Sequence, residues 1–86
     1  MHVTIISPER AVYDGEATAV VAPAYDGEVG ILPHHAPFMT LLGAGRLVVR
    51  RGGEASEYRV HGGFLQVRSD AVRIVAEHAE GASHGS

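Results

Sequence analysis

The adjacent pair His34-His35 is the first place where side chains of this sequence could do chemistry, because histidine is the commonest metal ligand in proteins. The chain carries six histidines in all. In an extended segment, however, successive side chains point to opposite faces, so two neighbours do not easily converge on one ion. No third ligand stands at a recognisable zinc spacing. We therefore predict no metal site, an exposed His34, and a structural or interface role for His35.

Nucleophilic and phosphate-binding chemistry also lacks its usual signatures. None of the serines lies in the context of a nucleophile elbow. The segment from Gly27 to Gly30 lacks the Gly-Lys-Ser/Thr ending of a phosphate-binding loop, and no helix is predicted to follow it. The carboxylates of Asp26 and Glu28 are typical of a turn. The sequence thus favours a protein that is not an enzyme and that has no cofactor.

Composition indicates one small globular domain. The chain has 86 residues, of which 45% are hydrophobic and 20% charged, too apolar for a disordered chain and too evenly mixed for a membrane span. Arginine is the only cationic residue type, and the net charge of −3 argues against nucleic acid as a partner. The chain has no cysteine, and its start is not a signal peptide. We expect a cytosolic or membrane-peripheral protein with a domain at 1–78 and a flexible tail at 79–86.

Glycine and proline divide the chain into short segments, a pattern typical of an all-β fold. The predicted strands are His2 to Ser7, Arg10 to Tyr13, Ala17 to Ala22, Glu28 to Leu32, Phe38 to Leu42, Arg46 to Arg51, Glu57 to His61, Phe64 to Arg68 and Ala71 to Glu77. This pattern predicts a two-sheet β-sandwich or flattened barrel of about ten short strands, nearly without helix. The predicted core contains Val3, Ile5, Val20, Ile31, Leu32, Leu41, Leu47, Val49, Val60, Leu65, Val67, Val72 and Ile74.

The segment from Gly27 to Thr40 is the part of the chain best suited to binding. Two prolines and two glycines fix its path, and rigid exposed loops usually bind something. Its run Gly-Glu-Val-Gly-Ile-Leu-Pro-His-His-Ala-Pro, residues 27–37, closely resembles the hallmark of the epsilon subunit of F-type ATP synthases. Two further segments, Ile5 to Glu9 and Gly62 to Val67, resemble other parts of the same family. The resemblance therefore covers about residues 2–78.

This resemblance implies a non-catalytic subunit of the central stalk of the rotor. Such a subunit links the gamma subunit to the polar loops of the membrane c-ring and couples proton or sodium-ion transport to ATP synthesis. It would lie peripherally at the cytoplasmic face of the inner (plasma) membrane, without inserting into it. Carried over by position, the c-ring interface would contain Glu28, Val29 and His34, and the gamma-subunit interface would contain Ser7, His35 and His61.

The sequence departs from the family pattern at its C-terminal end. Family members commonly continue into a helical hairpin that can block ATP hydrolysis, whereas here 13 residues follow Arg73, too few for two packed helices. We therefore expect coupling without inhibition. An alternative from another class is a stand-alone β-sandwich module that binds a ligand or peptide. A sugar platform is disfavoured because only 6% of residues are aromatic and none is tryptophan, and a small hydrolase would lack a nucleophile.

Overall fold

The computed structural model describes residues 1–81, and these form eight β-strands and no helix. The strands are β1 (His2–Ile6), β2 (Ala11–Glu16), β3 (Ala19–Ala24), β4 (Gly27–Ile31), β5 (Phe38–Leu41), β6 (Gly45–Arg51), β7 (Glu54–Arg68) and β8 (Ala71–Gly81). The predicted all-β class is confirmed. Eight strands replace the nine segments predicted, because two of those segments are one continuous strand, β7.

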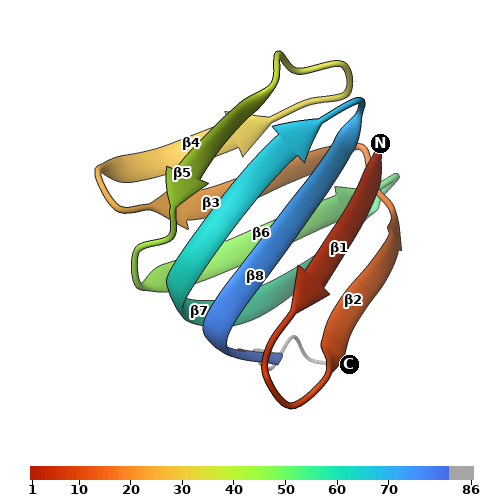
Figure 1. Cartoon of the computed structure of the whole chain (residues 1–86). Helices are drawn as coiled ribbons and strands as arrows, with labels where there is room; N and C mark the ends of the chain where they lie inside the picture. The colour runs from red at the N-terminus through yellow and green to blue at the C-terminus, as the bar shows by residue number, and fades with distance from the viewer. Residues whose placement is uncertain (82–86) are drawn as a thin grey trace.

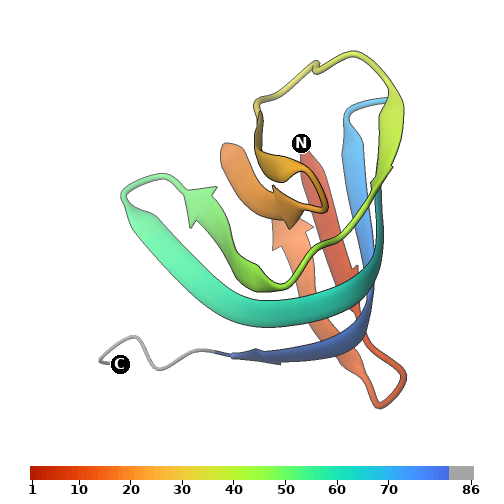
Figure 2. The same cartoon turned by 90° about the vertical axis from the view of Figure 1, so that its left-hand side faces the viewer.

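All eight strands belong to one mixed sheet that folds over on itself into two layers (Figures 1 and 2). Its order is β2-β1-β8-β7-β6-β3-β4, and β5 pairs with β7 off this path. Only β1 and β8 run parallel, and every other pairing in the described part is antiparallel. The two longest strands, β7 and β8, therefore contribute to both layers, which explains how a single sheet gives the predicted sandwich.

A glycine pair makes the bend in β7 that Figure 2 shows. Gly62 and Gly63 have positive φ angles of 72° and 106°. Before them Val60 faces the core, and after them Leu65 and Val67 do, so the alternation of inward and outward side chains changes phase at the bend. A Cβ at Gly63 would lie 1.9 Å from the carbonyl oxygen of Val75 on β8. Only glycine fits this position, and it lets one strand cross from layer to layer.

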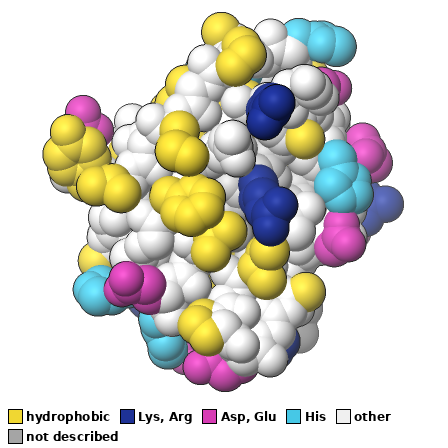
Figure 3. Space-filling model, in the orientation of Figure 1, with side chains coloured by type: hydrophobic (Ala, Val, Ile, Leu, Met, Phe, Trp, Pro, Cys, Tyr) yellow, Lys and Arg dark blue, Asp and Glu magenta, His cyan; other side chains and the backbone are white. Residues whose placement is uncertain are grey.

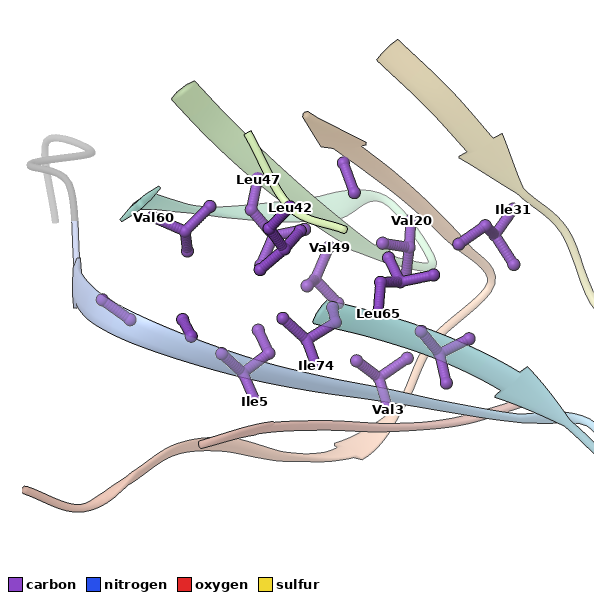
Figure 4. Packing of buried hydrophobic residues seen from close by; sticks show 14 of the residues in the cluster. Val3, Ile5, Val20, Ile31, Leu42, Leu47, Val49, Val60, Leu65 and Ile74 are labelled. Carbon is purple, nitrogen blue, oxygen red and sulfur yellow. The ribbon is translucent and has the colours of Figure 1, made fainter. Parts of the chain in front are cut away.

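The core lies between the two layers and contains nearly every residue predicted for it (Figure 4). Leu32 and Leu41 are the exceptions, with 63% and 60% of their surface exposed. Leu41 pairs with Phe64 on β7, and its neighbour Thr40 pairs with the buried Leu65, so Leu41 points outward. Leu32 follows the end of β4 and lies in the next loop. The core also contains five residues that were not predicted, namely Ala17, Ala22, Leu42, Ala76 and Ala79.

Strand boundaries differ from the predicted ones where the sequence carried turn signals. Asp14-Gly15 lies inside β2, and Pro23 lies inside β3, where β3 pairs with β6 only through Ala19 to Val21. Pro23 lacks a backbone N–H, but it lies outside the part of β3 that pairs with β6, so no hydrogen bond to β6 is lost. Residues 79–81, predicted to begin a loose tail, instead continue β8 against β7. The remainder of the predicted tail, 82–86, lies outside the described residues.

Candidate functional site

One surface of the sheet presents apolar side chains to solvent. Leu41 on β5, Phe64 on β7 and Val75 on β8 are direct cross-strand neighbours. Ile6 continues this row on β1, opposite Val75. The row faces outward by the period of two, because the residues next to it along the chain are buried, namely Ile5, Leu42, Leu65 and Ile74. We call this surface the outer face, with members Thr4, Ile6, Met39, Leu41, Phe64, Gln66, Arg68, Arg73 and Val75.

The outer face is both exposed and hollowed. Met39 and Leu41 each leave 60% of their surface exposed, although both are large apolar side chains. One hollow of about 430 Å³ lies beside Phe64 and Val75, and another of about 530 Å³ lies beside Met39 and Gln66. Figure 3 shows hydrophobic side chains gathered over β5 and β7 on this side of the molecule, with basic side chains next to them. Contiguous exposed apolar surface of this kind marks a binding face.

Ser7 and His35 lie at the two borders of the outer face. Ser7 is only 7% exposed and closes the turn between β1 and β2, where its hydroxyl donates to Glu9 and to the carbonyl oxygen of Arg10. It also lines the smaller hollow. The half-buried His35 ring lies 5.0 Å from the ring of Phe38, which lines the larger hollow. Ser7 and His35 thus both adjoin the apolar surface. Because the Ser7 side chain is buried, the part of this residue at the surface is mainly the backbone of the turn between β1 and β2.

His61 lies apart from these two residues. It precedes the glycine bend of β7, is exposed, and stands directly opposite His78 on β8. The bend separates it from Phe64, so it belongs to the layer that the outer face does not include. The structure therefore does not bring together the three positions predicted for one interface.

The loop after β4 is held in place by backbone contacts. The His34 N–H donates to a carboxylate oxygen of Asp70 at 2.8 Å, and the His35 N–H donates to the carbonyl oxygen of Leu32 at 3.2 Å. The Nδ1–H of the His35 ring donates to the carbonyl oxygen of the next residue, Ala36, at 2.7 Å. The hydrogen bond from the His34 N–H lowers the pKa of the Asp70 carboxyl.

Within residues 1–81, no three His, Asp or Glu side chains are placed to hold a metal ion.

The residues predicted for the ring interface lie at both ends of β4. Glu28 is exposed and pairs with Pro23 near the turn between β3 and β4. Val29 packs against the core from the same strand. His34 follows the other end of β4, which is Ile31. At the usual rise of a strand, Ile31 is already about 10 Å from Glu28, and His34 lies three residues farther along the chain. Glu28 and His34 therefore do not form one cluster.

A charged cluster stands at the sheet edge formed by β1 and β2. The His2 Nε2 lies 2.5 Å from Asp14 and its Nδ1 lies 3.3 Å from Glu16. Because each ring nitrogen faces a carboxylate, these two carboxylates raise the pKa of His2 above its ordinary value, Asp14 most of all. The N-terminal amine lies 3.6 Å from Glu16 and 3.9 Å from Asp70. This cluster ties the edge strand to the turn between β7 and β8.

Sequence reasoning did not single out the outer-face residues Met39, Phe64 and Val75. Each was assigned to a strand, and their apolar character suited a core as well as a surface. The signal that identifies them is the phase of alternation, which depends on knowing that Leu65 and Ile74 point inward.

Comparison with known proteins gives consistent matches. The family described as "ATP synthase, Delta/Epsilon chain, beta-sandwich domain" matches residues 1–82. The ATP synthase epsilon chain of Dehalococcoides mccartyi is 50% identical over 76 residues, which make up 88% of this chain and 54% of that protein. The epsilon chain of Caulobacter vibrioides is 39% identical over 79 residues, which make up 92% of both chains. The chain thus spans about half of one relative and nearly all of the other.

Solved structures show the same fold. A chain in the Euglena gracilis mitochondrial ATP synthase structure of OSCP, F1 and c-ring superposes with a TM-score of 0.85 at 27% identity, covering 92% of this chain and 51% of that chain. A chain in the Tetrahymena thermophila mitochondrial ATP synthase structure of central stalk and c-ring gives a TM-score of 0.80 at 17% identity, with 93% and 65% covered. The second likeness supports the fold alone.

Proposed function

Since the chain belongs to the family of ATP synthase delta/epsilon β-sandwich domains, we propose that it is a non-catalytic subunit of the rotor stalk of an F-type ATP synthase. It joins the gamma subunit to the polar loops of the c-ring, so that ion-driven rotation of the ring reaches the catalytic sites. The observation that carries this proposal is the match of the family across residues 1–82, together with the two relatives named above, both of which are ATP synthase epsilon chains.

The outer face suits a permanent partner such as gamma. Its apolar row spans four strands, and Met39 and Leu41 expose most of their surface when the chain is alone. Phe64 lies in the middle of the row with a hollow beside it, which is the arrangement expected of an anchoring aromatic residue in an interface. Burial of this surface against gamma would be stabilising at about 25 cal/mol per Å² of apolar area.

A second contact, to the c-ring, is proposed at β4 and its flanking turns. Glu28 is exposed there and can pair with basic groups on ring loops, while Val29 and His34 extend the predicted surface. For gamma, Ser7 and His35 border the outer face, and His61 would contact it only if the interface continues past the bend of β7. A stiff two-layer body with separate binding surfaces is what a torque-transmitting joint requires.

The proposed role is mechanical, and the proposed location is the cytoplasmic face of the inner (plasma) membrane. The Ser7 hydroxyl donates to Glu9 and to the carbonyl oxygen of Arg10 within the turn between β1 and β2, and we assign it a structural role. No helix of residues 1–81 is long and apolar enough to cross a membrane. From the family and from the two surfaces we propose a peripheral position on the ring, with no catalytic role for this chain.

Binding to gamma provides the test. The purified chain is mixed with gamma from the same organism and followed by size-exclusion chromatography and calorimetry. Leu41→Glu, which places a charge in the apolar row, should abolish co-elution. Leu32→Glu is the matched control, since Leu32 is equally exposed at 63% but lies off the outer face, and it should bind like the original chain. Failure of the unmodified chain to bind gamma, or its retention of glycans or peptides instead, would overturn the proposal.

A further inference from the structure

We propose that Arg68 and Arg73 make the outer face selective for a partner surface that carries carboxylates beside an apolar patch. This inference rests on the proposed function and specifies the chemistry of the stalk partner at that same face. The apolar row alone does not account for the two guanidinium groups that stand beside it.

Both arginines point outward from the two strands that form the centre of the face. Arg73 on β8 is the direct cross-strand neighbour of Gln66 on β7, and Arg68 lies two residues farther along β7. They are diagonal neighbours across the strand pair, about 7–8 Å apart in the backbone. Both are exposed, and each lines one of the two hollows, Arg73 beside Phe64 and Arg68 beside Met39. Two positive charges thus stand at one border of the apolar row.

Neither guanidinium has an ion-pair partner within the described part of the chain. Three carboxylates on neighbouring strands and turns contact other groups. Asp14 and Glu16 contact His2, and Asp70 accepts the N–H of His34 and faces the N-terminal amine.

Glu77, which lines a hollow together with Arg73, directs its carboxylate over Gly62, where an added Cβ would lie 2.4 Å from Glu77 Oε1. Within residues 1–81, Arg68 and Arg73 are therefore the unpaired cationic side chains of the face, and Glu77 is a carboxylate at its edge beside Gly62. The two arginines are positive although the whole chain has a net charge of −3.

An apolar surface bordered by two free guanidinium groups fits one kind of partner. Arginine forms bidentate pairs with carboxylates, and such pairs fix orientation as well as adding attraction. A partner with Asp or Glu side chains beside its own apolar patch would be steered to this face and turned into register, whereas a partner with basic groups there would be repelled. The net charge of the whole chain is −3, so attraction of this partner depends on the local positive charge of Arg68 and Arg73.

The test measures association with gamma, or with the catalytic complex lacking this subunit, by stopped-flow fluorescence at low and high salt. For the original chain the association rate constant should fall roughly tenfold as salt is raised, as expected for steered encounters. The double variant Arg68→Glu/Arg73→Glu should associate at least roughly tenfold more slowly at low salt and show little or reversed salt dependence. Arg51→Glu, at an exposed end of β6 in the other layer, is the matched control and should behave like the original chain.

The outcomes separate this inference from the function on which it rests. Circular dichroism first shows whether the double variant is folded, and Arg68→Gln/Arg73→Gln, which adds no negative charge, repeats the measurement with a milder change. Binding that is equally fast and equally salt-dependent in original, Gln and Glu variants would overturn the role of the arginines while leaving the stalk proposal standing. Absence of binding by the original chain would instead overturn the stalk proposal.

Discussion

Replacing Gly63 by alanine is expected to break the bend on which the two-layer fold depends. Gly63 has a φ of 106°, a region that residues with a Cβ rarely occupy. Holding alanine there costs about 1–3 kcal/mol of backbone strain. The added Cβ would also lie 1.9 Å from the Val75 carbonyl oxygen and 2.9 Å from Ala76 Cα. Relieving that contact moves β7 away from β8, at a further cost of about 1–3 kcal/mol by analogy with overpacked cores.

The total of about 2–6 kcal/mol is a large share of the 5–15 kcal/mol typical of a folded domain. Urea unfolding followed by circular dichroism measures it. With a slope of about 1 kcal/mol per molar urea, as for small proteins, the midpoint should fall by about 2 M or more, or the variant should be unfolded without urea.

Two other glycines, at positions 62 and 53, provide a graded control. Gly62→Ala meets only the movable end of the Glu77 side chain at a φ of 72°, so it should cost about 1–2 kcal/mol. Gly53→Ala meets nothing within 4 Å, and its cost should stay within about 0.5 kcal/mol. A Gly63→Ala midpoint indistinguishable from that of Gly53→Ala would refute the reasoning, because it would mean that the bend tolerates a side chain.

Three further predictions concern the core, the edge cluster and regulation. Leu65→Ala should lower the free energy of unfolding by about 2–4 kcal/mol, since Leu65 is fully buried, whereas Leu41→Ala should change it by less than about 0.5 kcal/mol; equal costs would contradict the core assignment. The stabilising effect of protonated His2 should be present below about pH 6.5 and lost as pH rises through its raised pKa; NMR titration should find that pKa lower in Asp14→Asn, and an unchanged value would rule out the pair. Added to a catalytic complex depleted of epsilon, the 86-residue chain should bind with little change in ATP hydrolysis, because β8 occupies its residues through Gly81; strong, saturable inhibition would contradict this.

The sequence predicted the strands well where apolar and polar residues alternate under strong burial. Leu47, Val49, Val72 and Ile74 fall inside as expected, because alternation with a period of two is a local property. It failed at Gly62-Gly63, which were taken as a break between strands. A pair of glycines with positive φ angles ends many strands, whereas this pair bends a strand that continues. Whether the strand ends or bends depends on how closely β8 passes beside it, which the local sequence does not specify.

The candidate site was harder to predict for the same reason. Leu41 and Leu42 are adjacent leucines, and which of them faces solvent is decided by the pairing of β5 with β7 across more than twenty residues of sequence. The functional positions carried over by resemblance came out dispersed, since a linear motif such as residues 27–37 includes both ends of β4. The predicted core already gave the phase of alternation in β7 and β8 through Leu65 and Ile74. Which outward residues lie side by side, and so form one face with hollows, depends on the pairing of the strands.

Glu28→Lys separates a role in ring coupling from a role in folding. Glu28 is an exposed carboxylate on the edge strand β4, and no ion pair within residues 1–81 involves it. Its reversal should therefore leave stability within about 0.5 kcal/mol. If the ring loops present basic groups, as the family resemblance implies, the change replaces an attraction at the rim by a repulsion, which slows docking and weakens register.

In membranes assembled with Glu28→Lys, ATP-driven proton pumping should fall relative to the ATP hydrolysis measured in the same sample. Glu54→Lys is the matched control, since Glu54 is an equally exposed carboxylate at the start of β7 on a different turn, and it should pump normally. Because hydrolysis and pumping are read together, a general loss of assembly lowers both and is recognised as such. Pumping that equals the control at the same hydrolysis rate would remove Glu28 from the ring interface and leave the turn between β3 and β4 as its only role.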